Sequence, residues 1–310
     1  AYSMSRVSGR WKLGLLLALT TACLWGVLPI ALKGVMVTLD PITTTFFRFA
    51  LAALLLSPYI IFRRGGNSAL NPKRFRSGML LMQLLVAGLL LTGNYGLYIV
   101  GLDRTTAEAA QLMIQVAPML LLLSGLWVFG ERFSRAQWLG FATFFSGLLM
   151  FFYPHFYGLF VAVNDYGVGV LMVLLAAVLW TGYATLQKFL LREFSSQETM
   201  LVFYWIGALA FLPFSDFNSL PQLSNLQWGL LLFCGLNTLI AYGSFAEAMV
   251  HIEASKVSTI LALTPLITFV TVHTISFTGL VVEPLTPLSI SGAILVVIGS
   301  MVTALNKVKD

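Results

Sequence analysis

The sequence predicts an all-α membrane protein with ten transmembrane helices, arranged as two inverted five-helix repeats. Of its 310 residues, 58% are hydrophobic and only 10% are charged, which is too few to give a soluble globule a polar surface. The hydrophobic residues form ten runs, each close to the ~20 residues that cross ~30 Å of hydrocarbon. In addition, the second half of the chain repeats features of the first.

The ten apolar runs are expected to be helices, because a lone strand would leave its backbone polar groups unpaired in lipid. A closed barrel would need strands of alternating polarity, and these runs do not alternate. In chain order the expected helices cover residues 13–33, 41–62, 77–100, 106–129, 136–153, 168–190, 197–214, 228–249, 255–280 and 286–305.

The basic residues favour one side of the membrane. With a cytoplasmic N-terminus, fifteen of the 18 lysines and arginines fall in cytoplasmic segments, and only Lys33 and Arg104 fall in outer ones. This bias predicts that both termini are cytoplasmic, in a multi-pass protein of the bacterial cytoplasmic (inner) membrane. The net charge of +6 is thereby explained, so the bilayer and a small-molecule substrate are the expected partners and nucleic acid is not.

Matched residues recur at constant spacings, which indicates an internal duplication. The separation is 155 residues for Trp25 and Trp180, 147 for Tyr95 and Tyr242 and for Pro118 and Pro265, and 152 for Gly140 and Gly292 and for Gly147 and Gly299. Five spans per unit is an odd number, so the second unit is expected to enter the membrane upside down.

The spacings divide the chain into five segments. Residues 1–12 form a cytoplasmic N-terminus, of which 1–3 precede Met4 and are expected to remain from cloning. Residues 13–153 form the first repeat, 154–167 an extracytoplasmic linker, 168–305 the second repeat and 306–310 a cytoplasmic C-terminus.

These residues form a pattern that resembles the EamA-type members of the drug/metabolite transporter superfamily. In the first half the pattern consists of Trp25-Gly26, Lys33, Arg48, Pro118, Gly130-Glu131-Arg132 and Gln137-Trp138-Leu139-Gly140 with Gly147; in the second half it consists of Trp180, Lys188, Pro265, Glu283 and Gly292 with Gly299. The resemblance implies a secondary transporter, with export of amino acids or related metabolites favoured. Thr181 in place of glycine and Phe203 at the position equivalent to Arg48 predict that the halves are not functionally equivalent.

Matched aromatic residues are the first candidates for a substrate site. Trp25 and Trp180 lie near the middle of their spans, away from the interfaces where tryptophan usually sits, and inverted-repeat transporters bind substrate near the midplane. We therefore expect a central aromatic cavity that works by alternating access, with plain helix packing as the alternative. The predicted substrate-binding residues are Trp25, Lys33, Tyr95, Tyr98, Gln111, Gln115, Trp180, Tyr183 and Tyr242.

A polar stripe follows the fourth span. Glu108, Gln111 and Gln115 are three and four residues apart and so share one helix face. Such groups are costly in lipid and must face protein or water. They either line the transport pathway or hold helices together.

Two matched pairs suggest structural roles. Pro118 and Pro265 each remove a backbone hydrogen bond inside a span, so they are predicted hinges, or they simply shape the bundle. Glu131 and Glu283 precede the last span of each repeat and are expected to cap the helices that follow.

Ionisable groups inside the membrane point to coupling. Glu247, near the cytoplasmic end of the eighth span, and Glu108 are the candidates for proton coupling. For Glu247 the alternatives are snorkelling to the membrane surface and pairing with Lys256 or Lys188.

Two cations lie toward the outer side. Lys33 and Arg48 could neutralise a substrate carboxylate, or they could pair with Asp40 or Glu108.

The chain carries no recognisable signature of catalysis, of a cofactor or of a metal site. His251 and His273 are isolated, and neither a His-Glu-x-x-His motif nor a phosphate-binding loop occurs. An intramembrane enzyme is therefore disfavoured, since it would need convergent acids or a nucleophile and base at the midplane. Within transport, an importer and an exporter of organic cations or drugs are the alternatives, the latter because aromatic faces attract cations.

Overall fold

The computed structural model describes residues 8–64, 77–128, 130, 132–252, 254–275 and 280–306. Within these residues ten helical segments are long and apolar enough to span a membrane, and no strand is present. The predicted all-α fold with ten spans is therefore confirmed. Residues 1–7 and 307–310 of the predicted termini, and Glu131, one of the two expected caps, lie outside the described residues.

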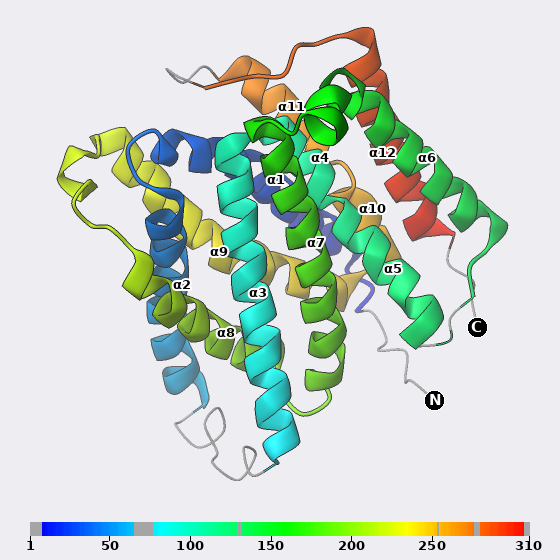
Figure 1. The fold of residues 1–310 in the computed structure, drawn as a ribbon. Helices are drawn as coiled ribbons and strands as arrows, with labels where there is room; N and C mark the ends of the chain where they lie inside the picture. Colours follow the sequence, from blue (N-terminus) through cyan, green and yellow to red (C-terminus); the bar gives the residue numbers. More distant parts are fainter. Residues whose placement is uncertain are drawn as a thin grey trace.

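In this part of the chain, eight spans are single helices and two are each divided into two shorter ones (Figure 1). The single helices are α1 (Trp11–Met36), α2 (Pro41–Arg64), α3 (Gly78–Arg104), α6 (Arg135–Phe152), α7 (Asp165–Leu190), α8 (Ser196–Phe211), α9 (Asn225–His251) and α12 (Pro287–Leu305). The fourth span consists of α4 (Ala107–Ile114) and α5 (Val116–Val128), and the ninth of α10 (Ala254–Leu261) and α11 (Thr264–Thr274).

The two divided spans break at equivalent places, and proline explains both breaks. A proline has no N–H, and its ring crowds the carbonyl group four residues earlier. Four residues before Pro118 is Ile114, the last residue of α4, and four before Pro265 is Leu261, the last residue of α10. The carbonyl groups of Ile114 and Leu261 therefore lack the N–H that a continuous helix would supply.

Helices α6, α9 and α12 begin with capping boxes, in which the cap and the third helical residue bond each other's backbone. The pairs are Ser134 with Gln137, Ser224 with Gln227, and Thr286 with Ser289. The expectation that Glu283 caps the last helix is wrong. Thr286 has the short hydroxyl side chain that reaches the free N–H groups, and Glu283 lies three residues too early.

The ninth span also ends earlier than expected. Helix α11 ends at Thr274 and Ile275 is extended, whereas the apolar run predicts a helix to residue 280. Hydropathy measures apolar character and not conformation, and β-branched residues such as these also favour extended backbone.

Helices from the two halves pack in matching pairs. Helix α1 packs along α9 and α3 packs along α7, so the first and third spans of each half meet the third and first spans of the other. Helix α2 packs against α8, and α6 against α12, which joins equivalent spans. This arrangement is compatible with the predicted inverted repeat.

Helices α6 and α12 run antiparallel and very close together (Figure 1). A Cβ atom added to Gly140 would lie 3.0 Å from the carbonyl oxygen of Gly299, and one added to Gly147 would lie 2.6 Å from that of Gly292. Real Cβ atoms essentially never lie within 3.0 Å of a non-bonded atom and are seldom as close as 3.0 Å, so glycine allows the two backbones to pack in this way.

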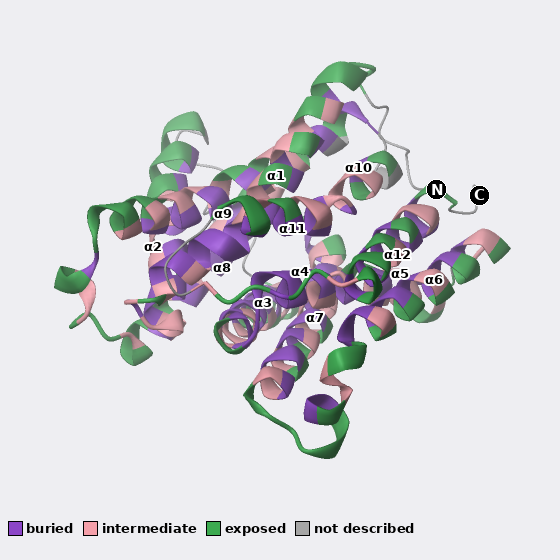
Figure 2. Cartoon of the chain, turned by 90° about the horizontal axis from the view of Figure 1, so that it is seen from above, coloured by how far each residue is buried: buried purple, intermediate pink, exposed green. Residues whose placement is uncertain are grey.

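Large apolar side chains cover the outside of the bundle. Leu54, Phe62, Leu89 and Leu209 are among the exposed ones, and buried residues lie between the helices (Figure 2). A soluble monomer rarely exposes so much apolar surface, whereas lipid solvates it.

Candidate functional site

A cavity of about 210 Å³ lies between the two halves of the bundle. The helix breaks border it: Ile114 and Gln115 line it at the end of α4, and Leu261 and Thr264 line it between α10 and α11. Breaks of this kind expose backbone polar groups that a continuous helix would hide, and transporter sites are built on them.

Seven of the nine predicted substrate-binding residues line this cavity. They are Trp25, Tyr95, Tyr98, Gln111, Gln115, Trp180 and Tyr242, and the predicted hinge residue Pro118 joins them. Trp25 contacts the rings of Tyr242 and Phe245, at centroid distances of 5.3 and 5.9 Å. The cavity wall therefore combines five aromatic residues with aliphatic side chains and with amide and hydroxyl groups.

Two predicted substrate-binding residues lie outside the cavity lining. The Nζ atom of Lys33 donates to the carbonyl oxygens of Asp103 and Thr105, at the end of α3, where the helix dipole favours a cation. Tyr183 is buried beside Phe203, and its hydroxyl group donates to Sδ of Met200 at 3.5 Å. Helical spacing made it plausible that both side chains face the cavity. It could not show that each has a hydrogen-bond partner elsewhere.

Arg48 lines the cavity from α2 and is 3% exposed. Its Nε atom donates to Oγ1 of Thr238 at 3.2 Å, and its guanidinium carbon lies 4.9 Å from the centre of the Tyr95 ring. Neither of the acids that the sequence suggested as partners, Asp40 and Glu108, forms an ion pair with it. Asp40 instead accepts a hydrogen bond from the backbone N–H of Thr43.

A second cavity, of about 530 Å³, lies at the end of the bundle where α2 ends and α8 begins. Tyr242 lines both cavities, so the two meet at its ring. Glu247 lines this second cavity and not the central one, and its carboxylate lies 3.2 Å from Nε2 of His251. The alternative role of Glu247, pairing with a lysine, is not supported by an ion pair among the described residues; the contact that the structure shows is with His251, one helical turn away.

The opposite end of the same helices is filled with aromatic rings. Phe49 is fully buried and packs on Tyr95 and Phe211, at centroid distances of 4.7 and 5.9 Å. Beyond it, Phe46 and Phe217 pack edge to face at 5.6 Å. The bundle is therefore hollow at one end of α2 and packed at the other.

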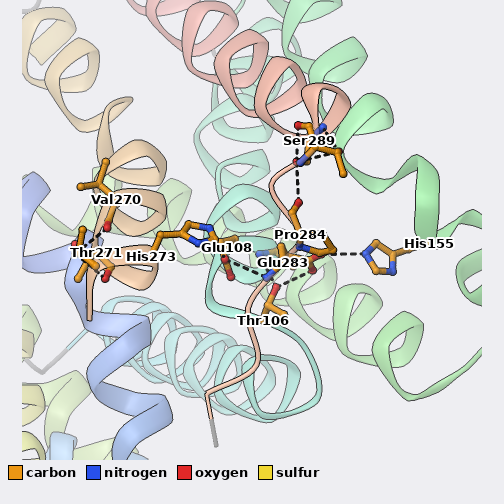
Figure 3. A network of polar contacts seen from close by, with 12 residues as sticks. Thr106, Glu108, His155, Val270, Thr271, His273, Glu283, Pro284 and Ser289 are labelled. Atoms are coloured by element: carbon orange, nitrogen blue, oxygen red, sulfur yellow. Dashed lines mark hydrogen bonds and ion pairs between the residues drawn. The ribbon is translucent and has the colours of Figure 1, made fainter. Parts of the chain in front are cut away.

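At the packed end, a polar network joins both halves and the predicted linker (Figure 3). Glu283 is its centre: Thr106 and Tyr166 donate to Oε1 at 2.8 and 2.6 Å, and Nε2 of His155 lies 3.2 Å from Oε2. Burial alone would raise the pKa of Glu283, but hydrogen bonds from His155, Tyr166 and Thr106 outweigh it and hold the pKa below its usual value.

Glu108 belongs to this network and not to the cavity lining. It is fully buried, its Oε1 atom accepts a hydrogen bond from the backbone N–H of Glu283 at 3.2 Å, and Nε2 of His273 lies 3.6 Å from the same oxygen. Its Oε2 atom has no hydrogen-bond partner among the described residues. The predicted stripe is thus divided, with Gln111 and Gln115 at the cavity and Glu108 at the packed end.

The remaining candidate is Pro265, which is the second residue of α11 and is not part of the cavity lining. In the described part of the chain no three His, Cys, Asp or Glu side chains are grouped to hold a metal ion.

Sequence reasoning left three polar lining residues out of the site. Asn94, Thr238 and Thr264 all line the cavity, but each is a single small polar residue in an apolar run, and such residues can also bond a helix instead of a substrate. Asn94 lines the cavity and also donates, through Nδ2, to the carbonyl oxygen of Ala176 in α7 at 2.7 Å. The one sequence feature that could have placed Asn94 at the site is its neighbour Tyr95, which has an equivalent in the second half.

Comparison with known proteins adds a family. The model of the EamA-like transporter family matches residues 12–153 and 167–305. The chain is 36% identical to the uncharacterized inner membrane transporter YhbE of Escherichia coli K12, over 94% of this chain and 91% of the relative. It is 26% identical to the pseudopaline exporter CntI of Pseudomonas aeruginosa, over 80% and 82% of the two chains.

A solved structure supports the fold alone. It superposes with a TM-score of 0.62 at 18% sequence identity, over 94% of this chain and 97% of the other. Together these matches confirm the resemblance drawn from the Trp25 and Trp180 pattern.

Proposed function

Because the chain belongs to the EamA-like transporter family, we propose that it is a secondary transporter of the inner membrane that exports a small amphipathic metabolite, an amino acid or a related compound. Its route is the central aromatic cavity, reached by alternating access. The relatives' names support the membrane and the class of protein: YhbE is an inner membrane transporter and CntI is an exporter.

The observation that carries this proposal is the position of the cavity. It lies where two discontinuous spans break, between two halves that pack in matching pairs. This is where secondary transporters with repeated halves bind substrate. Its volume of about 210 Å³ is below the roughly 300–1,000 Å³ typical of pockets for drug-sized ligands, which favours a small metabolite over a bulky drug.

We propose export because the hollow end of the bundle is the end from which an exported substrate would enter. In the predicted orientation, the second cavity lies on the cytoplasmic side and the packed aromatic rings lie on the outer side. A substrate would enter from the cytoplasm past Tyr242, and the two halves would then exchange their packing to release it outside.

We further propose that a proton drives this exchange through Glu108. Glu108 contacts the loop before α12 and the end of α11, so it joins the two halves where they must part. The titratable and charged groups around it are Glu283, His273, Tyr166 and Lys33. Glu247 is the second candidate, but it is 58% exposed and its contact with His251 stays within α9.

The test of transport is counterflow in proteoliposomes that hold the purified protein and are preloaded with single amino acids and related metabolites. Uptake of labelled compound above that of empty liposomes is expected for at least one of them, and the absence of any exchange would sink the proposal. Direction is read separately, in everted and right-side-out membrane vesicles. Accumulation in everted vesicles marks an exporter, and accumulation in right-side-out vesicles marks the importer alternative.

A further inference from the structure

The charges around the central cavity are one-sided. Among the described residues, Arg48 is the one ionisable cation in its lining, and no acidic side chain lines it. The other polar groups are the amides of Asn94, Gln111 and Gln115 and the hydroxyl groups of tyrosine and threonine. The cavity can therefore offer a full positive charge to a ligand and no full negative one.

Arg48 has no counter-charge among the residues that the structure describes. It forms no ion pair with any described residue, and Nε is its one hydrogen-bonding atom. Its terminal nitrogens are not among the sealed, unpartnered atoms of the described residues, so they are accessible from the cavity with their N–H groups unused. An arginine held at 3% exposure within a span is costly unless a partner completes it.

The tyrosine ring under the guanidinium group positions this charge. The guanidinium carbon lies 4.9 Å from the centre of the Tyr95 ring, and Nε is bonded to Thr238, so both contacts hold the group in place. The two terminal nitrogens of an arginine form a planar pair of donors that can match the two oxygens of a carboxylate.

We infer that Arg48 binds a carboxylate group of the substrate at the central cavity, so that the transported compound is an organic acid or an amino acid and not an organic cation. This inference rests on the proposed function and names the chemical class that the same site takes. Trp25 and Trp180 would hold the apolar part of such a compound.

An amino group on the same substrate has a weaker site of its own. Ile114 and Leu261 border the cavity, and their carbonyl groups lack the helical N–H that Pro118 and Pro265 cannot supply. Carbonyl dipoles can accept from an ammonium group but do not neutralise it. The carboxylate is therefore the required group, and the amine is tolerated.

The second half offers no equivalent charge. Phe203, at the position that corresponds to Arg48, is fully buried against Tyr183. The site therefore binds the carboxylate on the α2 side alone, and an inverted pose of the substrate is excluded.

The test is ligand-induced thermal stabilisation of the purified protein by two matched series. One series is phenylpropionate, phenethylamine and phenylalanine; the other is isocaproate, isoamylamine and leucine. Within each series the apolar part is constant, and the members carry the carboxylate, the amine or both. Stabilisation by a carboxylate-bearing member and none by the amine-only member is expected in at least one series. Stabilisation by amine-only members alone, or by no member of either series, overturns the inference.

Variants assign the effect to Arg48. Arg48→Gln is expected to raise the dissociation constant of the carboxylate ligand roughly 10- to 100-fold, as for the loss of a charge-assisted hydrogen bond, and Arg48→Lys to retain part of the preference. Arg104→Gln, which removes an exposed cation paired with Asp165 on the surface, should bind as the unmodified protein does. A carboxylate preference that survives in Arg48→Gln contradicts the inference, and Arg48→Lys keeps the test valid if the glutamine variant does not fold.

These experiments measure binding and not transport, so the failure of one proposal can be distinguished from the failure of the other. Carboxylate binding without exchange would contradict the transporter proposal alone. Transport restricted to amines would sink the role of Arg48 alone.

Discussion

Trp25 in α1 lies edge to face against Tyr242 in α9, with ring centroids 5.3 Å apart and ring planes at 71°. The contact joins the two halves at the point where the central cavity meets the second cavity. Tyr242 lines both cavities and Trp25 lines the central one, so in the proposed mechanism a substrate that moves between the cavities would pass beside this pair.

Replacing Trp25 or Trp180 by alanine is therefore expected to reduce counterflow to background while the protein stays in the membrane. Loss of a large aromatic contact of ~1.5–3 kcal/mol corresponds to roughly 10- to 100-fold weaker binding. Trp127→Ala is the control, because Trp127 is 82% exposed on the outside of the bundle. Full activity in both cavity variants would remove the tryptophans from the site.

Replacing Pro118 or Pro265 by alanine restores the N–H that the carbonyl group of Ile114 or Leu261 lacks. We expect a more continuous span, a stability gain of about 0.5–1.5 kcal/mol from the added hydrogen bond, and slower transport because the break is lost. Melting temperature and counterflow rate are measured together. Pro58→Ala is the control, since Pro58 lies inside α2 and outside the central lining; transport unchanged in both cavity variants would argue against the hinges.

The two proton-coupling candidates are separated by matched neutral variants. In everted vesicles, Glu108→Gln is expected to remove the dependence of transport on a pH gradient and to leave gradient-free counterflow in place. Glu247→Gln should keep the gradient dependence, because its exposed carboxylate does not join the halves. The reverse result would move the coupling site to Glu247.

Glu283 should make stability depend on pH. Its pKa in the folded protein is lowered, so its stabilising effect is present above the unfolded value of ~4.3 and is lost as the pH falls through the folded value. Glu283→Gln is expected to lose about 1–3 kcal/mol at neutral pH, and to differ little from the unmodified protein well below pH ~4. Asp165→Asn is the control. The Asp165 side chain is 74% exposed and pairs with Arg104 on the surface, so this change should alter the free energy of unfolding by less than about 1 kcal/mol. A difference that persists unchanged in acid would contradict the assignment.

Gly147→Ala should destabilise the protein by about 1–3 kcal/mol, because the new Cβ atom would collide with the backbone of α12. Gly229→Ala is the matched control. A Cβ atom there meets nothing within 4 Å inside α9, and alanine should stabilise that helix by roughly 0.5–1 kcal/mol. Equal effects on unfolding in detergent would show that the close approach of α6 and α12 does not depend on glycine.

The spans could be predicted because hydrocarbon thickness fixes their length and lipid fixes their conformation. The aromatic lining was predictable too, because Trp25 and Tyr95 each have an equivalent in the second half. The depth of each side chain along a span was less predictable: Glu108, in the first turn of α4, meets Glu283 and His273, whereas Gln111, one turn later in the same helix, lines the cavity. Helical spacing shows which residues share a face of a helix but not where along that face the cavity begins.

Long charged side chains were the other reason why the predicted roles differ from the contacts in the structure. Lys33 and Glu283 were assigned from their positions along the chain, but each reaches partners from segments far away in the sequence. The sequence shows where a charged side chain starts and not which carbonyl or hydroxyl group it meets. Arg48 stayed ambiguous for the same reason, since its two suggested acidic partners were excluded only by the fold.

The glycine contact between α6 and α12 has the form of an interface between identical subunits. Position 140 corresponds to 292 and position 147 to 299, so Gly140 against Gly299 and Gly147 against Gly292 are the same contact seen from either side. A two-fold axis produces this self-complementary pairing in homodimers. A single five-helix chain with these two glycines would thus already carry the surface for associating with an oppositely oriented copy of itself, before any gene fusion linked the two.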